Sequence, residues 1–149
     1  MKIDQSEQTE DLHFAAGNGD LKTVEALIDA GANIHYFDTL SYSALHYAVK
    51  SGNRQLVHRL LELGADVNSH LAGYAGETPI TIAVEEGSFD ITKLLLNYGA
   101  DPYITGWMRL DALDSAEQRK DEKGNKLKAL ILREHPPSKE RLKRDYNRG

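Results

Sequence analysis

The side chains best suited to catalysis in this 149-residue chain are its six histidines and the adjacent carboxylates Glu85 and Glu86. An imidazole acts as a general base near neutral pH, and paired carboxylates can divide acid and base roles. His13 and His46 stand in the same Leu-His pair of a repeated motif, and the two glutamates fall at a turn where nothing orients them as a couple. The other four histidines show no metal-binding spacing such as His-x-x-x-His, and they are His35, His58, His70 and His135.

The sequence also lacks the motifs that carry most catalytic chemistry. It has no Gly-rich phosphate loop between a strand and a helix and no Gly-x-Ser-x-Gly nucleophile turn. Cysteine is absent, which removes a thiolate nucleophile, disulfides and cysteine-type zinc sites. We therefore expect a non-enzymatic protein without a cofactor or a bound metal, and an enzyme is the first alternative.

Charge and hydropathy narrow the classes of partner and the location. No apolar run approaches the roughly 18 residues that span a membrane, and the polar start of the chain is unlike a secretory signal. We therefore expect a cytoplasmic protein without a membrane partner. The net charge is −5, but the segment 136–149 holds five basic and two acidic residues (+3), so the remainder carries −8. An acidic body argues against nucleic-acid binding, the second alternative, which needs many Lys and Arg contacts to phosphates and weakens steeply with salt.

The candidate catalytic residues belong to a sequence that repeats itself at a nearly fixed period. An apolar residue followed by a short Ala-containing run recurs at offsets of 33, 35 and 33 residues. The four copies are 12–16, 45–49, 80–84 and the degenerate 113–116. A second marker, Gly-Ala followed by Asn or Asp, keeps the same spacing at Gly31, Gly64 and Gly99. Such a period predicts a solenoid of stacked small units, which shifts the search for function from a pocket to an extended surface.

Each unit reads as two short helices followed by a loop. The first helix begins at a residue whose side chain accepts hydrogen bonds from free N–H groups, and the second begins in the same way directly after a glycine. The expected caps are Ser43, Thr78 and Asp111 for the first helices and Asp20, Asn53 and Ser88 for the second. In the last unit, Gly124–Asn125 is expected to cap a final helix whose apolar residues are Leu127, Leu130 and Ile131.

These motifs resemble the ankyrin repeat, whose signature is Gly-x-Thr-Pro-Leu-His-x-Ala followed by a glycine turn, a Leu-rich helix and Gly-Ala-Asp. The segment 76–83 matches it well, with Thr81 in place of the usual histidine, and 43–48 is a variant of it. The resemblance implies an all-α ankyrin-repeat solenoid of helix-turn-helix units with projecting hairpin loops, in which the first helices line a concave face. It also implies that His13 and His46 form hydrogen bonds that tie neighbouring loops together.

The likeness covers residues 9–135, which divide into repeats of about 9–40, 41–75, 76–108 and 109–135. The first and last repeats depart from the pattern, as expected of caps that expose one outer face to water. A polar segment, 1–8, precedes them, and the basic segment 136–149 follows after Pro136–Pro137 has stopped the last helix. We expect this tail to be flexible or partly helical.

The resemblance implies that the protein binds one protein partner through the tips of the loops and the concave face. On the first helices, Phe14, Tyr47 and Ile82 fall in the column expected to look into the groove of that face. Three loop segments, hereafter the fingers, span residues 36–42, 69–75 and 103–109 and hold six of the chain's 11 aromatic residues. Exposed Trp, Tyr and Met supply binding hot spots, although a single ring can instead pack against a neighbouring finger or first helix. The residues expected to contact the partner are Phe37, Thr39, Leu40, Tyr42, Tyr47, Lys50, His70, Leu71, Tyr74, Ile82, Glu85, Glu86, Trp107, Met108 and Arg109.

The sequence leaves the role of that binding open. Short arrays of this look are similar to bacterial proteins, some of which neutralise or chaperone a cognate protein, including immunity proteins against secreted toxins. This similarity implies an inhibitor or immunity-type binder of a cognate toxin or enzyme. An adaptor, a scaffold or a secreted host-targeting effector of ankyrin type is the alternative, and in each case we expect the free chain to be a monomer.

Overall fold

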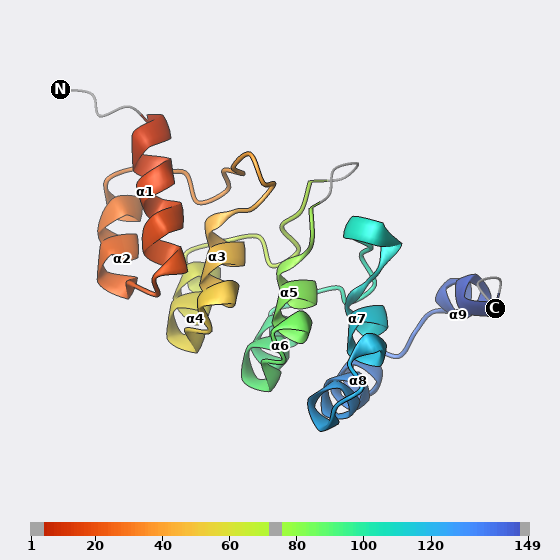
Figure 1. Cartoon of the computed structure of the whole chain (residues 1–149). Coiled ribbons are helices and arrows are strands. Elements are labelled where there is room, and N and C mark those ends of the chain that lie inside the picture. The colour runs from red at the N-terminus through yellow and green to blue at the C-terminus, as the bar shows by residue number, and fades with distance from the viewer. Residues whose placement is uncertain (1–4, 72–75, 147–149) are drawn as a thin grey trace.

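The computed structural model of the protein describes residues 5–71 and 76–146, and within these ranges the backbone forms helices and loops without a strand. The helices pair and stack into an elongated array (Figure 1). Their bounds are α1 Gln5–Gly17, α2 Leu21–Asp29, α3 Ala44–Ser51, α4 Arg54–Glu62, α5 Pro79–Glu85, α6 Phe89–Asn97, the 3-10 helix η1 Trp107–Arg109, α7 Ala112–Gln118, α8 Glu122–Glu134 and α9 Lys139–Tyr146. The expectation of an all-α solenoid of helix-turn-helix units is confirmed.

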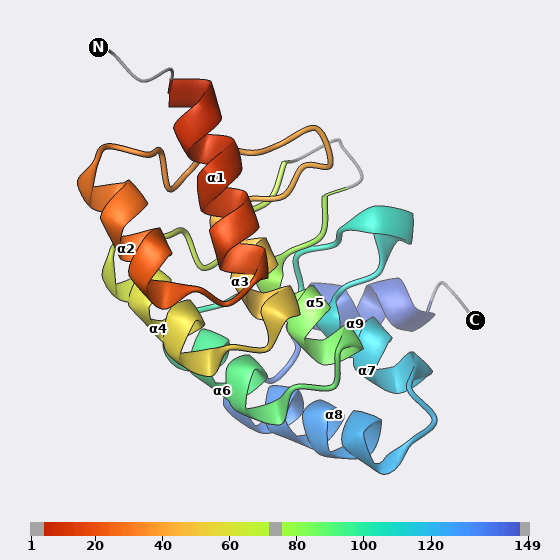
Figure 2. The same ribbon diagram turned by 60° about the vertical axis from the view of Figure 1, so that its left-hand side comes forward.

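The array is built from two rows of helices. The first helices of the units, α1, α3, α5 and α7, contact one another in series, and α4, α6 and α8 form a second row in the same way. The loops that join one unit to the next project to one side of the array, as two views of the ribbon show (Figures 1 and 2). The stacking therefore places the fingers and the first helices next to one another.

Local chemistry decides where the helices begin. The N-caps of α2 to α7 are Asp20, Ser43, Asn53, Thr78, Ser88 and Asp111, which confirms the six caps expected from the sequence. Pro79 follows Thr78 at the first helical position, where the missing N–H leaves no hydrogen bond unmade. Between the two helices of a unit, Gly52 adopts a φ of 74°, a left-handed conformation that glycine enters without strain.

Two helix starts differ from the expectation. Helix α1 begins at Gln5, within the segment expected to be a polar N-terminal extension. Helix α8 is capped by Asp121, whose Oδ1 accepts a hydrogen bond from the N–H of Gly124 at 2.8 Å, so Gly124 lies inside the helix instead of capping it. A Cβ on Gly124 would lie 2.5 Å from Cβ and 2.6 Å from the main-chain oxygen of Arg119. The glycine therefore serves the close approach of α8 to the end of α7.

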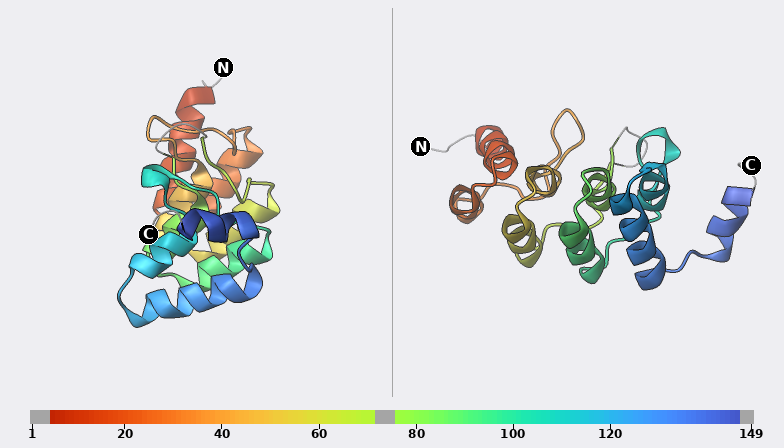
Figure 3. Two further views of the ribbon diagram at one scale, coloured as in Figure 1. Left: turned by 90° about the vertical axis from the view of Figure 1, so that its right-hand side faces the viewer. Right: turned by 60° about the horizontal axis from the view of Figure 1, so that its bottom comes forward.

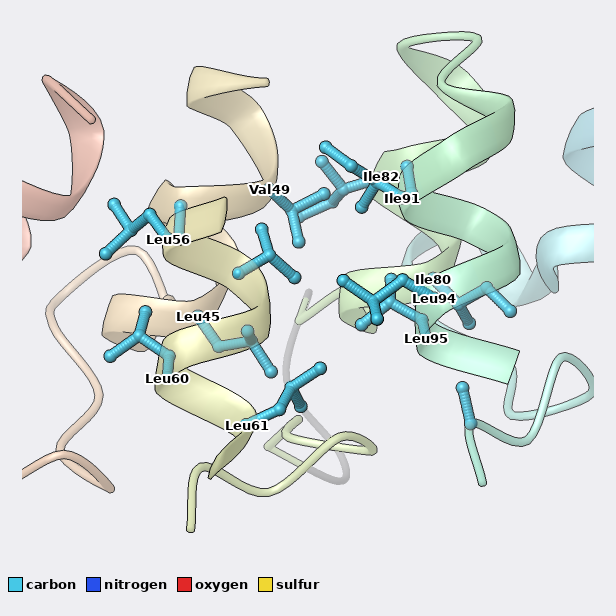
Figure 4. Packing of buried hydrophobic residues seen from close by; sticks show 14 of the residues in the cluster. Leu45, Val49, Leu56, Leu60, Leu61, Ile80, Ile82, Ile91, Leu94 and Leu95 are labelled. Carbon is cyan, nitrogen blue, oxygen red and sulfur yellow. The ribbon is translucent and has the colours of Figure 1, made fainter. Parts of the chain in front are cut away.

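The apolar core runs through the whole stack. Leu45 and Leu61 from one unit point toward Ile80 and Leu95 from the next, and all four are buried (Figure 4). Alanine occupies fully buried positions on the first helices, where a small side chain lets neighbouring helices approach. Each fully buried leucine contributes about 1.5–3 kcal/mol relative to an exposed one. Packing between units thus holds the fingers at a fixed spacing.

The segment 136–149 contains α9, which lies at the C-terminal end of the array (Figure 3). Arg141 of α9 is buried, and its Nη2 forms ion pairs with Asp111 and Asp114 at the start of α7. The guanidinium also lies over the ring of Tyr103, 5.5 Å from its centroid. The basic tail is therefore docked to the last repeat through one of its own cations, a contact that the sequence pattern did not predict.

Candidate binding surface

The first finger, residues 36–42, is held in one shape by the carboxylate of Asp38. Its oxygens accept hydrogen bonds from the N–H of Leu40 at 2.8 Å, the N–H of Tyr42 at 3.0 Å and the hydroxyl of Tyr47 at 2.5 Å. Burial opposes ionisation of Asp38, but these hydrogen bonds outweigh it and lower the pKa of the carboxyl. Because Tyr47 belongs to α3, the finger is tied to the first helix of the next repeat, and Thr39 and Leu40 are left exposed at its tip.

The aromatic rings at the base of the first finger pack inward. Tyr42 is half-buried and stacks on His46 with a centroid distance of 5.2 Å and an interplanar angle of 5°. Phe37 is also half-buried, 6.2 Å from the same imidazole. Lys50 places its Nζ 5.7 Å from the Tyr42 centroid. For the rings of Tyr42 and Phe37, the structure favours packing within the protein, which the sequence left as an alternative to contact with a partner.

The second finger is described only in part, because residues 72–75 lie outside the described ranges. His70 and Leu71 are half-buried at its start, and Nδ1 of His70 donates to the main-chain oxygen of Asn68 at 2.8 Å. Tyr74, expected as a central anchor, is one of the residues outside the description. Its contact with a partner stays a prediction.

The third finger, residues 103–109, presents an apolar tip on a turn with left-handed backbone. The N–H of Gly106 donates to Leu110 at 2.9 Å, and the N–H of Arg109 donates to Gly106 at 3.1 Å. Met108 and Arg109 have φ values of 58° and 61°, a conformation that disfavours residues with a Cβ by about 1 kcal/mol or more. This turn leaves Met108 71% exposed, close to the 67% of Leu40 in the first finger. The side chain of Trp107 lies outside the description, so its role also stays a prediction.

The first helices bring a second set of expected contact residues to the same side of the array. Lys50, Glu85 and Glu86 are exposed at the ends of α3 and α5, and Tyr47 is half-buried. Ile82, by contrast, is 2% exposed and belongs to the core. It was expected to face a partner from the same column as Tyr47, but α3 and α7 cover α5 on both sides and its shorter side chain ends within that packing. Ile82 therefore offers no contact surface.

Carboxylates dominate the electrostatics beside these helices. Burial raises the pKa of Glu77, and the charge of Lys50 opposes that rise. Burial also raises the pKa of Glu85, with the charge of Glu77 acting in the same direction and a hydrogen bond from Ser115 against it. The ionised form of Glu85 is thus destabilised by burial and by the charge of Glu77. A basic group supplied by a partner relieves that repulsion, which fits the expectation that Glu85 and Glu86 favour a basic patch.

A hollow of about 360 Å³ lies beside α1 and α3 at the N-terminal end of the array. The residues that line it include Phe14, which is 75% exposed, and His13, which is buried. Phe14 was expected in the column facing the concave side but was not among the residues expected to contact the partner. The available signal was its position in the first repeat, whose first helix packs against one neighbouring unit instead of two among the residues described.

Two findings bear on acid–base catalysis and metal binding at this surface. His46 uses both ring nitrogens within the fold, since Nδ1 accepts from the N–H of Ser43 at 3.0 Å and Nε2 donates to the main-chain oxygen of Glu77 at 2.7 Å. Among the residues described, no group of three His, Cys, Asp or Glu side chains is placed to hold a metal ion. No helix in that part of the chain is long and apolar enough to cross a membrane.

Comparison with known proteins agrees with the repeat pattern. A family model described as ankyrin repeats (3 copies) matches residues 12–106. The chain is also 31% identical over 103 residues to an ankyrin repeat protein of Acanthamoeba polyphaga mimivirus. That match covers 66% of this chain and 62% of the viral protein, so the chain spans about three fifths of the length of the relative that it matches.

Proposed function

Since the chain belongs to the ankyrin-repeat family, we propose that it is a non-enzymatic module that binds one protein partner through its finger tips and the first helices beside them. Ankyrin repeats generally mediate protein–protein interaction, and proteins of the family typically have no catalytic activity. The observation that carries the proposal is the pair of exposed apolar tips, Leu40 and Met108, which project from fingers with hydrogen-bonded backbones.

The fixed shape of the first finger supports a binding role. A loop that is already ordered loses little conformational entropy when a partner docks, and each side chain immobilised on binding costs about 0.5–1.5 kcal/mol. Asp38 accepts three hydrogen bonds that fix the tip before any partner arrives. Leu40 is then presented as an apolar anchor, the type of contact around which interfaces concentrate their binding energy.

For the biological role of this binding, we keep the two hypotheses of the sequence analysis in the same order. We propose first an inhibitor or immunity-type binder of a cognate toxin or enzyme, present as a monomer in the cytoplasm. An adaptor, a scaffold or a host-targeting effector is the alternative. An inhibitor forms a one-to-one complex that abolishes its partner's activity, whereas an adaptor leaves that activity intact, so assaying the purified complex separates them.

The tip variants Leu40→Ala and Met108→Ala, made together, test the surface. Both side chains are exposed, so the double variant is expected to fold normally, which far-UV circular dichroism checks. Phe89→Ala is the matched control, because Phe89 is an exposed apolar residue on α6 in the second row of helices. For a purified partner, we expect at least about a tenfold loss of affinity, or about 1.4 kcal/mol, in the tip variant alone. Equal affinity of the wild type and the tip variant would contradict the proposal.

A further inference from the structure

The hollow beside α1 and α3 combines a buried polar atom with apolar walls. The described residues that line it are Glu10, His13, Phe14, Gly17, Asn18, Asp38 and Tyr47. Its volume of about 360 Å³ corresponds to roughly twelve water molecules, at about 30 Å³ for each. It is therefore large enough for a long side chain that enters from outside.

His13 provides the polar atom. The residue is 6% exposed, and its Nε2 is inaccessible to solvent and has no hydrogen-bond partner. An unsatisfied buried polar group typically costs about 1–3 kcal/mol, and a ligand that pairs with it recovers that free energy. The equivalent nitrogen of His46 forms a hydrogen bond with the main-chain oxygen of Glu77. The hydrogen bond that the fold supplies to this nitrogen in the second repeat is therefore missing in the first.

The protonation of His13 decides which partner this nitrogen accepts. Burial lowers the pKa of His13, against the charges of Asp38 and Glu10 and a hydrogen bond to the backbone of Tyr36, which raise it. The ring is therefore neutral at physiological pH, and a neutral imidazole offers a lone pair at one nitrogen. An N–H donor on the ligand then satisfies Nε2.

The charges around the hollow select a cationic donor. Glu10 is exposed on α1, and Asp38 holds its negative charge while accepting hydrogen bonds from Tyr47 and the finger backbone. Of the residues that line the hollow, two are carboxylates and none is a lysine or an arginine. Phe14 and Tyr47 add aromatic surface, on which a planar guanidinium stacks better than a compact ammonium does.

We propose that this hollow receives an arginine side chain of the protein partner, with the guanidinium stacked against Phe14 and Tyr47, one N–H donated to Glu10 and another donated to His13 Nε2 once a shift of the lining rings has exposed that atom. This inference rests on the proposed protein-binding function and specifies one chemical contact within it. An arginine provides five N–H donors in a rigid fork, so one side chain can meet both the imidazole and the carboxylate. The partner is then expected to carry an arginine that projects from its interface.

The test uses the full chain and two capped pentapeptides, acetyl-Gly-Ser-Arg-Ser-Gly-amide and the same peptide with citrulline, which keeps the shape but lacks the charge. Nuclear magnetic resonance titration follows the His13 imidazole and the Phe14 and Tyr47 rings. We expect saturable shifts of these signals with the arginine peptide and at least tenfold weaker binding of the citrulline peptide. Equal responses to the two peptides, shifts confined to other residues, or no saturable shift at millimolar peptide would overturn the assignment.

Two exposed variants and one control locate the effect. Glu10→Gln and Phe14→Ala are each expected to weaken binding of the arginine peptide several-fold. Glu62 is an exposed acid on α4, and Glu62→Gln is expected to leave the affinity for the peptide unchanged. The failure of this inference can be told from that of the proposed function. If the tip variant binds a purified partner more weakly while the arginine peptide leaves the His13 signals unchanged, only the assignment of the hollow to arginine is contradicted. If the arginine peptide binds at His13 but the tip variant keeps full affinity for the partner, the proposed binding through the finger tips is contradicted.

Discussion

The Nη2 nitrogen of Arg141 lies 3.1 Å from Oδ1 of Asp111, the residue that caps the first helix of the last repeat. The same nitrogen lies 3.1 Å from Asp114, three residues further on. In the second repeat the equivalent pair is Ser43 and His46, and His46 donates a hydrogen bond to the main-chain oxygen of Glu77, which follows the second finger. The last repeat is followed by α9, and the guanidinium of Arg141 from that helix forms ion pairs with the corresponding residues, Asp111 and Asp114. The ion pair thus closes the end of the stack.

Replacing Arg141 with methionine is expected to destabilise the protein strongly. The change keeps most of the apolar stem but removes the cation from Asp111 and Asp114, and breaking a buried ion pair on one side typically costs about 3–5 kcal/mol. Urea unfolding followed by circular dichroism measures the loss. Arg133→Met is the control, because Arg133 pairs with Glu134 on the exposed face of α8, where such pairs contribute about 0–1 kcal/mol. Similar losses in the two variants would show that Arg141 does not close the stack.

Stability is expected to fall as the solution is acidified from pH 6.5 towards pH 4. Burial lowers the pKa of His46 to about 4, against hydrogen bonds to the backbone of Glu77 and Ser69 and the charge of Asp38. The ordinary pKa of a histidine side chain is 6.5, so between these values the unfolded chain binds a proton that the folded chain does not. The contribution is fully present above pH 6.5 and is lost at up to about 1.4 kcal/mol per pH unit. Burial lowers the pKa of His13 too, which acts in the same direction.

The variant His46→Thr separates this effect from general acid denaturation. Threonine is a native solution at the same place, since Thr81 pairs there with Thr78 at 2.9 Å in the third repeat. At pH 7 the variant is expected to lose about 1–3 kcal/mol, because the main-chain oxygen of Glu77 loses its donor. Towards pH 4 its free energy of unfolding should converge with that of the wild type. A constant difference across this range would rule out His46 as the titrating group.

Sequence reasoning succeeded where the chemistry is local. A Ser, Thr or Asp side chain at a helix start satisfies N–H groups only a few residues away, so Ser43, Thr78 and Asp111 were recognisable without any knowledge of packing. It failed at α8 because Gly124 resembles a turn residue, whereas a contact with Arg119 explains the glycine. The pairing of Arg141 with Asp111 joins residues 30 apart, and no spacing in the chain marks it.

The candidate site shows the same limit. The repeat period assigns Phe14, Tyr47 and Ile82 to equivalent positions of their first helices, but it does not indicate how far the packing around each helix covers that position. Phe14 at the end of the array is open, whereas Ile82 between two neighbouring units is closed. Within the first finger, the N–H groups of Leu40 and Tyr42 both donate to Asp38, but the ring of Tyr42 stacks on His46 whereas the side chain of Leu40 is exposed.

Asn53 is expected to link two repeats as well as cap a helix. Its Oδ1 accepts from the N–H of Leu56 at 3.1 Å, and its Nδ2 donates to the main-chain oxygen of Gly19 at 3.0 Å. Asn53→Asp keeps the cap and loses the link, at about 0.5–1.5 kcal/mol, and Asn53→Ala loses about 1 kcal/mol more with the cap. Asp20→Asn, at the equivalent cap of the first unit, is the control and should be nearly neutral. Chemical unfolding of the four proteins checks this order, and equal stability of Asn53→Asp and the wild type would contradict the link.

The glycines at positions 17 and 124 are expected to respond oppositely to the same substitution. A Cβ on Gly124 would lie 2.5–2.8 Å from Cβ and the main-chain oxygen of Arg119 and from the main-chain oxygen of Ala116, so α7 and α8 must move apart to admit it. Overpacking of this kind costs about 1–3 kcal/mol. On Gly17 the nearest atom to a new Cβ is Cδ1 of Tyr47 at 3.6 Å, an ordinary contact, and alanine stabilises a helix relative to glycine by up to about 1 kcal/mol. Thermal unfolding should therefore show a lowered midpoint for Gly124→Ala and an equal or raised midpoint for Gly17→Ala. The reverse order would mean that the close packing of α7 on α8 is not what requires glycine at position 124.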